Sequence, residues 1–332
     1  MNLLAKLVAV AAFLFATPLW ASDVQVDPAV VYANEHGDKD NPYRQGWYGK
    51  GETRLHYVEA GKGPLVILYH GFPSTWFSWF DLMEELKGRY RVVAVDALGA
   101  GLSGKPRDLA PYRIDRLARQ LDGLARKVDG NRPFVLIGHD WGAALSLAYA
   151  QAYPRRVKAV VGMSAPPYNL FLDLVTRNEK QRAMSAYMQT FRTQSYADVR
   201  DSGFAPRFAA QVYGALRDAG HLTKEEASLF EKAVGDVDAM SGGMNWYRAN
   251  LPPFEKLDES WYWPRDNRPI QAPTLIIWGD RDHTFLPVFL DQMPAYARSV
   301  SVAHFPGVGH MTPIESSGPT NKRIAQFLAD HR

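Results

Sequence analysis

The chain of 332 residues contains no cysteine. Disulfide bonds, thiol nucleophiles and zinc sites built on cysteine are therefore excluded. An excess of one charge is also missing, because 38 Lys and Arg residues stand against 35 Asp and Glu residues and no long basic run occurs. Since binding to nucleic acid requires a basic stripe or patch, the sequence predicts no nucleic-acid partner.

Long hydrophobic runs are scarce, and one of them opens the chain. Lys6 precedes an apolar stretch from Leu7 to Phe15, which Pro18 and the small residue Ala21 follow. This order is typical of a cleaved export signal, and the stretch is short for a membrane span. We expect residues 1–21 to be a signal peptide, and the mature protein to be periplasmic or secreted without a stable membrane anchor. An uncleaved anchor is the alternative.

Short apolar runs alternate with helical patterns along most of the chain. Hydrophobic residues make up 46% of it, which is enough for a sizeable core. The predicted strands are residues 54–59, 65–70, 91–96, 134–138, 157–163, 274–279 and 299–305. The clearest helical patterns lie at 114–128, 143–153 and 321–329. Strands that alternate with helices predict an α/β protein, with a mostly parallel sheet covered on both faces.

This alternation stops between residues 166 and 268, which carry helical patterning and many aromatic residues but no convincing strand. We interpret this stretch as a helical cap inserted into the core. The predicted core then has a first part at 22–165 and a second part at 269–332. Residues 23–50 are rich in Asp, Asn, Gly and Pro, and we expect an irregular surface segment there.

A nucleophile elbow follows the predicted strand at 134–138. The sequence Gly138-His139-Asp140-Trp141-Gly142 has the pattern glycine, any residue, nucleophile, any residue, glycine, and a helical pattern follows directly. Such a turn raises its central side chain above the carboxyl ends of the strands, where folds of this class bind ligands. The alternative is that Asp140 caps the helix or ends the strand.

The residue at the centre of the elbow determines the chemistry. Most elbows carry serine, whereas this one carries Asp140, so a serine-esterase mechanism is excluded. A carboxylate is already ionised near neutral pH and needs no base for its first attack. It suits displacement at a saturated carbon, which leaves an alkyl ester on Asp140. A base and a water molecule must then hydrolyse this ester.

The base and its acidic partner are predicted near the C-terminus. His310 lies in a glycine-flanked loop after the last predicted strand, and Asp280 and Asp282 follow the strand before it. The chain order nucleophile, acid, histidine is that of the nucleophile-elbow fold. We therefore assign His310 as the base, with Asp282 preferred over Asp280 to orient it. The competing histidines are His36, His283 and His304.

The segment His70-Gly71-Phe72-Pro73 follows another predicted strand. In this fold the corresponding loop supplies one backbone N–H of the oxyanion hole, and the residue after the nucleophile supplies the other. These positions correspond to the N–H groups of Phe72 and Trp141. The Phe72–Pro73 bond is a candidate for the cis form. An ordinary turn is the alternative.

These motifs together resemble the α/β-hydrolase superfamily and, within it, the epoxide hydrolases. The similar segments are HGFPSTWFSW, GHDWGAAL, GDRDHTFLP and GVGHMTPIE, and the likeness extends from about Gly51 to Phe327. The resemblance implies the α/β-hydrolase fold with a sheet of the eight-stranded type, a small-molecule substrate, and no metal or organic cofactor. Haloalkane and haloacetate dehalogenases share the same nucleophile motif.

Residues of the predicted cap help to distinguish an epoxide oxygen from a halide as the leaving group. In epoxide hydrolases two cap tyrosines donate hydrogen bonds to the ring oxygen, and the resemblance puts these at Tyr247 and, by a looser match, at Tyr187. Both could instead be packing residues of an aromatic-rich cap. The resemblance also implies that His70, Pro73, Trp141 and Trp246 contact the substrate.

Two other functions stay open. A dehalogenase needs donors for the halide, and Trp141 could be one, but the asparagine that often follows His-Gly is replaced by Phe72. A catalytically idle binding protein on the same fold is the second alternative. We expect an epoxide hydrolase that converts an apolar epoxide to a vicinal diol.

Overall fold

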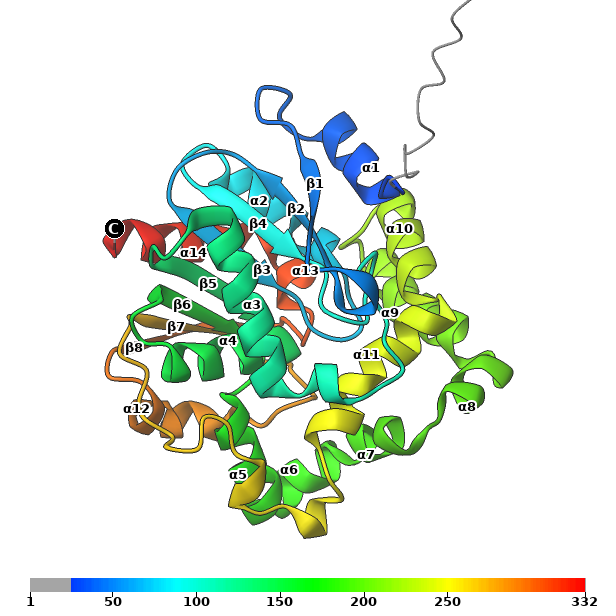
Figure 1. The fold of residues 1–332 in the computed structure, drawn as a ribbon, viewed down its shortest axis with the longest axis vertical. Helices are drawn as coiled ribbons and strands as arrows, with labels where there is room; N and C mark the ends of the chain where they lie inside the picture. The colour runs from blue at the N-terminus through cyan, green and yellow to red at the C-terminus, as the bar shows by residue number, and fades with distance from the viewer. Residues whose placement is uncertain (1–24, 332) are drawn as a thin grey trace, which may run out of the picture.

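The computed structural model describes residues 25–331, so the predicted signal peptide lies outside the described residues. Its centre is an eight-stranded sheet in the order β1-β2-β4-β3-β5-β6-β7-β8 (Figure 1). The strands are β1 (Arg44–Tyr48), β2 (Leu55–Ala60), β3 (Leu65–Tyr69), β4 (Arg91–Val95), β5 (Phe134–His139), β6 (Val157–Met163), β7 (Thr274–Gly279) and β8 (Val300–Phe305). Strand β2 is antiparallel to both of its neighbours, and β3 to β8 pair in parallel.

The central strands owe their position to continuous apolar sequence. Every residue of β3, β5 and β7 is buried, as expected for parallel strands covered on both faces. Helices α2 (Phe80–Leu86) and α14 (Ser317–Asp330) pack together on one face, and α3 (Ile114–Asp129) and α4 (Trp141–Ala152) cover the other. The predicted α/β architecture is therefore confirmed.

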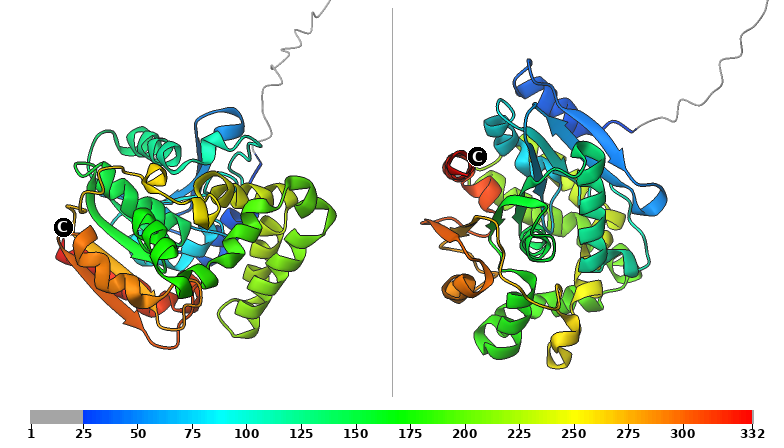
Figure 2. Two further views of the ribbon diagram at one scale, coloured as in Figure 1. Left: turned by 90° about the horizontal axis from the view of Figure 1, so that it is seen from below. Right: turned by 60° about the vertical axis from the view of Figure 1, so that its left-hand side comes forward.

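The segment between β6 and β7 is helical. Its helices are α5 (Tyr168–Arg177), α6 (Glu179–Met184), α7 (Ala186–Thr193), α8 (Tyr196–Asp201), α9 (Phe204–Asp218), α10 (Lys224–Val234) and α11 (Val237–Asn250). Figures 1 and 2 show them gathered beside the sheet as a separate layer. The inserted helical cap of the predicted fold is thus present. Two short helices, α12 (Met293–Tyr296) and α13 (Thr312–Glu315), belong to the second core part.

The prediction of an irregular segment at residues 23–50 is wrong. This segment contains helix α1 (Pro28–His36) and strand β1, which pairs with β2. Asp27 caps α1 by accepting a hydrogen bond from the N–H of Ala29. Pro28 occupies the first helical position, where an N–H would have no partner within the helix, so its absence removes no hydrogen bond. Because β1 is an edge strand in which no residue is fully buried, it lacks the apolar pattern by which strands are recognised.

Helix α11 joins the cap to the core. The side chain of Asn250 accepts a hydrogen bond from the N–H of Ile114 at 2.8 Å and donates to the carbonyl of Tyr112 at 2.8 Å. The indole N–H of Trp246 donates to the carbonyl of Leu98 at 2.9 Å. These bonds set the position of Tyr247, which lies on the same helix. Among residues 25–331, no helix has both the length and the apolar character that crossing a bilayer requires.

Candidate active site

Asp140 lies at the sharp turn between β5 and α4, with φ of 52° and ψ of −124°. A side-chain carbon at Gly138 would lie 2.1 Å from the carbonyl oxygen of Gly142, and one at Gly142 would lie 2.0 Å from that of Tyr69. The turn therefore requires both glycines. The Asp140 side chain makes no capping bond to α4, a helix that the structure describes in full, so the helix-cap interpretation of Asp140 does not hold.

The carboxylate of Asp140 is buried, and its two oxygens have different partners. The N–H of Phe72 donates to Oδ1 at 2.8 Å, whereas Oδ2 lies 3.4 Å from Nε2 of His310. A side-chain carbon at Gly71 would lie 2.3 Å from Oδ1, so glycine is needed there for this close approach. One oxygen is thus held by the backbone, and the other faces the imidazole.

His310 connects two carboxylates. Its Nδ1 lies 2.8 Å from Oδ2 of Asp282, and its Nε2 faces Asp140. Asp282 is buried, and its Oδ1 accepts a hydrogen bond from the N–H of Thr284 at 2.6 Å. The structure therefore brings together the nucleophile, base and acid in the predicted combination.

The competing residues lie elsewhere. Asp280 pairs with His304 at 2.9 Å on the surface. His283 is exposed, and His36 interacts with the carbonyl of Tyr32 on α1. This placement favours Asp282 and His310 over the alternatives weighed from the sequence.

The electrostatics of the site favour an ion pair. Burial raises the pKa of Asp140, but the hydrogen bond and positive charge of His310 and the N–H of Phe72 outweigh it, so the pKa is lowered from 3.8. Burial lowers the pKa of His310, but the charge of Asp282 and the hydrogen bonds to Asp140 and Asp282 raise it to about 10. In the resting protein His310 is therefore a cation between two carboxylates.

The predicted oxyanion-hole loop surrounds the carboxylate. The N–H of Phe72 already points at Asp140. Trp141 is the first residue of α4, where backbone N–H groups have no partner within the helix. The Phe72–Pro73 peptide bond is cis, as predicted. Two N–H groups are thus available beside the carboxyl group, as an oxyanion hole requires.

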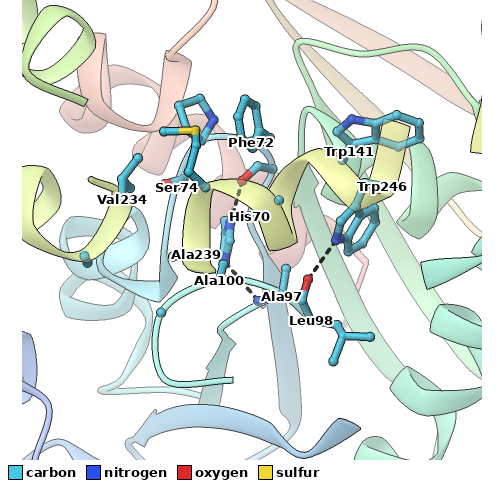
Figure 3. A pocket seen from close by; sticks show the side chains of 16 residues that line it. His70, Phe72, Ser74, Ala97, Leu98, Ala100, Trp141, Val234, Ala239 and Trp246 are labelled. Carbon is cyan, nitrogen blue, oxygen red and sulfur yellow. Dashed lines mark hydrogen bonds between the residues drawn. The ribbon is translucent and has the colours of Figure 1, made fainter. Parts of the chain in front are cut away.

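His70 lines one of the cavities beside the site, and both of its ring nitrogens are bonded to the backbone. Its Nδ1–H donates to the carbonyl of Gly71 at 2.7 Å, and its Nε2 accepts from the N–H of Ala97 at 2.9 Å (Figure 3). Burial lowers the pKa of His70, in agreement with a neutral ring. Because both nitrogens are bonded to the backbone, His70 holds the oxyanion-hole loop in place and has no polar group free for a substrate.

The two predicted cap tyrosines meet opposite Asp140. Tyr247 on α11 packs edge-on against Trp141, with ring centroids 5.2 Å apart, and both Tyr247 and Tyr187 lie 5.4 Å from the ring of Phe191. Burial and the negative charge of Asp140 raise the pKa of each phenol well above its ordinary value. The two hydroxyls also lie close enough to affect each other's pKa. Both phenols therefore keep their protons and can donate them.

Two apolar cavities adjoin this arrangement. One, of about 20 Å³, is lined by Asp140, Trp141, Met188 and Phe285. The other, also of about 20 Å³, shares Trp141 with the first and is drawn in Figure 3. Trp246 and Pro73 line the second cavity, as their predicted contact with substrate requires. The indole N–H of Trp246 is, however, already bonded to Leu98.

Some residues around the site were not found from the sequence. Met188 and Phe285 line the cavity beside Asp140. The signal for Met188 was the apolar character of the cap, and the signal for Phe285 was its presence in the segment that carries Asp282. His139 and Glu315 contact the backbone around His310. Their signal was their presence in the two motifs that carry the nucleophile and the base.

One group of side chains has the composition of a metal site. Ligand atoms of Asp27, His56 and Asp96 lie within 4.8 Å of one another. However, Asp96 already accepts hydrogen bonds from His56 and from the N–H groups of Trp76 and Leu102. The carboxylate oxygens of Asp96 therefore already accept hydrogen bonds from N–H groups, and this set of donors does not suit a bound cation.

Comparison with known proteins agrees with this geometry. Epoxide hydrolase 3 of Xenopus tropicalis is 30% identical over 288 residues, which cover 83% of this chain and 75% of the relative. Epoxide hydrolase 4 of Mus musculus is 31% identical over 236 residues, which cover 69% of this chain and 63% of the relative.

Solved structures give the same result. The structure of an epoxide hydrolase from Bacillus megaterium with an inhibitor covers 86% of this chain and 100% of its own, with a TM-score of 0.75 and 25% identity. Epoxide Hydrolase A from Mycobacterium thermoresistibile covers 86% and 98%, with a TM-score of 0.71 and 28% identity. Residues 64–317 match the alpha/beta hydrolase fold family. The chain therefore belongs to the α/β-hydrolase family.

Proposed function

We propose that the protein is an epoxide hydrolase that converts an apolar epoxide to a vicinal diol through an ester of Asp140. The observation that carries this proposal is that Tyr247, which packs against Trp141, and Tyr187, which packs against Phe191, meet near a carboxylate nucleophile. The relatives named as epoxide hydrolases support it. The apolar cavities beside Asp140 suit an apolar substrate.

In the first step Asp140 attacks one carbon of the epoxide. A bond forms between a carboxylate oxygen and this carbon, and the bond from the carbon to the ring oxygen breaks. Oδ2 is the attacking oxygen, because Oδ1 is held by the N–H of Phe72. The ring oxygen becomes an alkoxide that accepts hydrogen bonds from Tyr187 and Tyr247. A phenol can donate in this way without prior ionisation.

The proton that the alkoxide takes up is supplied by the site. His310 is a cation in the resting state because Asp140 and Asp282 are both negative. Formation of the ester removes the charge of Asp140, so the pKa of His310 falls. A tyrosine hydroxyl then protonates the alkoxide and regains a proton from water, while His310 gives its proton to water and becomes neutral. The first step thus prepares the base for the second.

In the second step neutral His310 takes a proton from water, and the resulting hydroxide attacks the ester carbonyl carbon. The N–H groups of Phe72 and Trp141 stabilise the oxyanion, while Asp282 stabilises the imidazolium. The bond between the carbonyl carbon and the alkyl oxygen breaks, and the departing alkoxide takes the proton of the new carboxyl group. The diol leaves, and Asp140 and the protonated His310 are restored.

The test compares substrate classes and traps the ester. We expect the purified protein to form diols from styrene oxide-like epoxides and to release no halide from haloalkanes. Halide release without diol formation would identify a dehalogenase, and no turnover of either class would favour an idle binding protein.

The His310→Gln variant should accumulate an ester on Asp140, because the first step needs no base. Intact-protein mass spectrometry after mixing with an epoxide should show a mass increase equal to the substrate. The double variant with Asp140→Asn is the control and should show none. No adduct in the single variant, with a substrate that the wild type turns over, would contradict covalent catalysis.

We propose further that the protein is exported and that its mature form begins near Ser22. The positive, apolar and small residues at the N-terminus support this. Expression of the full chain in a Gram-negative host, fractionation and N-terminal sequencing test it. An uncleaved chain in the membrane fraction would contradict it.

A further inference from the structure

The loop that carries His310 is held on both sides by one carboxylate. Glu315 accepts hydrogen bonds from the N–H of Gly309 at 2.7 Å and from the N–H of Met311 at 2.8 Å. These two residues flank His310. Because hydrogen bonds to an ionised acceptor are about twice as strong as neutral ones, Glu315 restrains the backbone directly before and after the base.

The carbonyl of His310 is held from the opposite direction. Nε2–H of His139 donates to it at 2.8 Å. The His139 ring is buried and lies 5.2 Å from the His310 ring, centroid to centroid. Burial and the charge of His310 lower the pKa of His139 to about 4, so His139 is neutral. It is therefore a fixed donor that ties the residue before the nucleophile to the backbone of the base.

Glycines beside the base leave just enough space for the Glu315 carboxylate to reach the loop. A side-chain carbon at Gly309 would lie 2.9 Å from each carboxylate oxygen of Glu315 and one at Gly279 would lie 2.4 Å from the carbonyl of Gly309. The glycines of these two segments thus permit the close approach of Glu315 and of the β7 end to the loop.

We propose that Glu315 and His139 are positioning residues for the second step of the reaction, which hold the imidazole of His310 in line with water and the ester carbonyl. Neither residue touches the substrate or the reacting atoms. The inference rests on the proposed function, since it assigns the two residues to one of its two steps.

The two steps make different demands on this restraint. Attack by Asp140 requires no base, whereas hydrolysis requires His310 to be held within a narrow range of positions. A displacement of about 1 Å can lower a rate by about 100-fold. Loss of the Glu315 contacts should therefore slow ester hydrolysis and leave ester formation nearly unchanged.

The test uses Glu315→Gln in the full mature protein, because an amide can accept one of the two bonds but not both. We expect ester hydrolysis to slow by about 10- to 100-fold. In steady state kcat and KM should then fall together, with kcat/KM unchanged, because kcat/KM reports only steps up to ester formation. Quenched samples should show the ester accumulating on Asp140 by mass spectrometry.

A purely structural role gives a different result. Partial unfolding lowers the concentration of active protein, so kcat falls, KM stays constant and no ester accumulates. That pattern would overturn the inference, as would an unchanged hydrolysis rate. Glu85→Gln is the matched control, because Glu85 is an exposed residue that pairs with Arg89 on the surface. It should behave like the wild type.

Replacement of His139 gives a second readout that does not depend on Glu315. His139→Leu removes the donor and should also accumulate ester, whereas His139→Gln offers an amide N–H and should restore part of the hydrolysis rate. Equal rates in the two variants would contradict a role for the hydrogen bond. If the wild type itself forms neither diol nor ester, the proposed function fails, and this result is distinct from a failure of the positioning role.

Discussion

The imidazole of His310 between two carboxylates links the chemistry of the site to the stability of the protein. The folded state raises the pKa of His310 from 6.5 to about 10, so it holds the proton more tightly than the unfolded chain does. The stabilisation is therefore fully present below pH 6.5 and is lost as the pH rises toward 10.

We accordingly expect the free energy of unfolding to decrease between pH 7 and pH 10, where the folded protein keeps a proton on His310 that the unfolded chain has lost. Urea denaturation across this range measures it. In His310→Gln the decrease should be smaller, since no proton is bound at that position. Parallel curves for the two proteins would show that the ion pair of His310 does not stabilise the fold.

At the same scale, the two phenols should act on the first step alone. Tyr247→Phe and Tyr187→Phe each remove one donor to the ring oxygen, and each should lower kcat/KM by about 100-fold. Single-turnover kinetics should place the loss in ester formation. The control is Tyr196→Phe, because Tyr196 lies on α8 and stacks on Arg107. If both variants keep the kcat/KM of the wild type, the two tyrosines are packing residues and do not donate to the ring oxygen.

Among the secondary-structure elements, α1 depends on one side chain. Asp27 caps the helix and also accepts the indole N–H of Trp76 at 2.7 Å. Asp27→Ala should lower the free energy of unfolding by about 1–3 kcal/mol, because the helix loses its cap and the indole N–H of Trp76 loses its acceptor. Asp27→Asn keeps an acceptor for the helix and should lose less, while kcat stays that of the wild type in both. Equal stability of the Ala variant would show that α1 contributes little.

The elements that could be predicted from the sequence are those whose own residues determine their secondary structure. Strand β5 and the elbow were recognised because an apolar run meets two glycines, and the chain order placed Asp282 and His310. Strand β1 could not be recognised, because partners on β2 and not apolar residues define it. The meeting of Tyr187 with Tyr247 could be expected only from the resemblance to epoxide hydrolases, since it depends on how α7 packs against α11.

For the whole molecule, the sheet brings together segments that lie far apart in sequence. Phe72, Asp140, Asp282 and His310 all follow the carboxyl ends of parallel strands, and the cap adds the tyrosines from above. The site is therefore complete only when the cap is docked on the core. Asn250 is central to this docking, because it bonds to the backbone of Ile114 and Tyr112.

Asn250→Ala should therefore weaken both stability and catalysis. It leaves buried backbone groups of the core without partners, and we expect a loss of about 1–3 kcal/mol in the free energy of unfolding. The value of kcat/KM should fall as well, because Tyr247 lies on the same helix. Asn131→Ala, at an exposed position, is the control. A variant with lower stability but unchanged kcat/KM would show that the docking of the cap through Asn250 does not determine the position of Tyr247.

The unequal environment of the two Asp140 oxygens has a consequence for the origin of the product's atoms. If Oδ2 attacks the epoxide while Oδ1 stays with Phe72, hydrolysis at the carbonyl carbon sends Oδ2 out with the diol and puts an oxygen of water in its place. In water enriched in ¹⁸O, the diol of a first turnover should carry a light oxygen taken from the protein, and later turnovers should carry the heavy isotope. The enzyme would then exchange an atom of its own with solvent in each catalytic cycle.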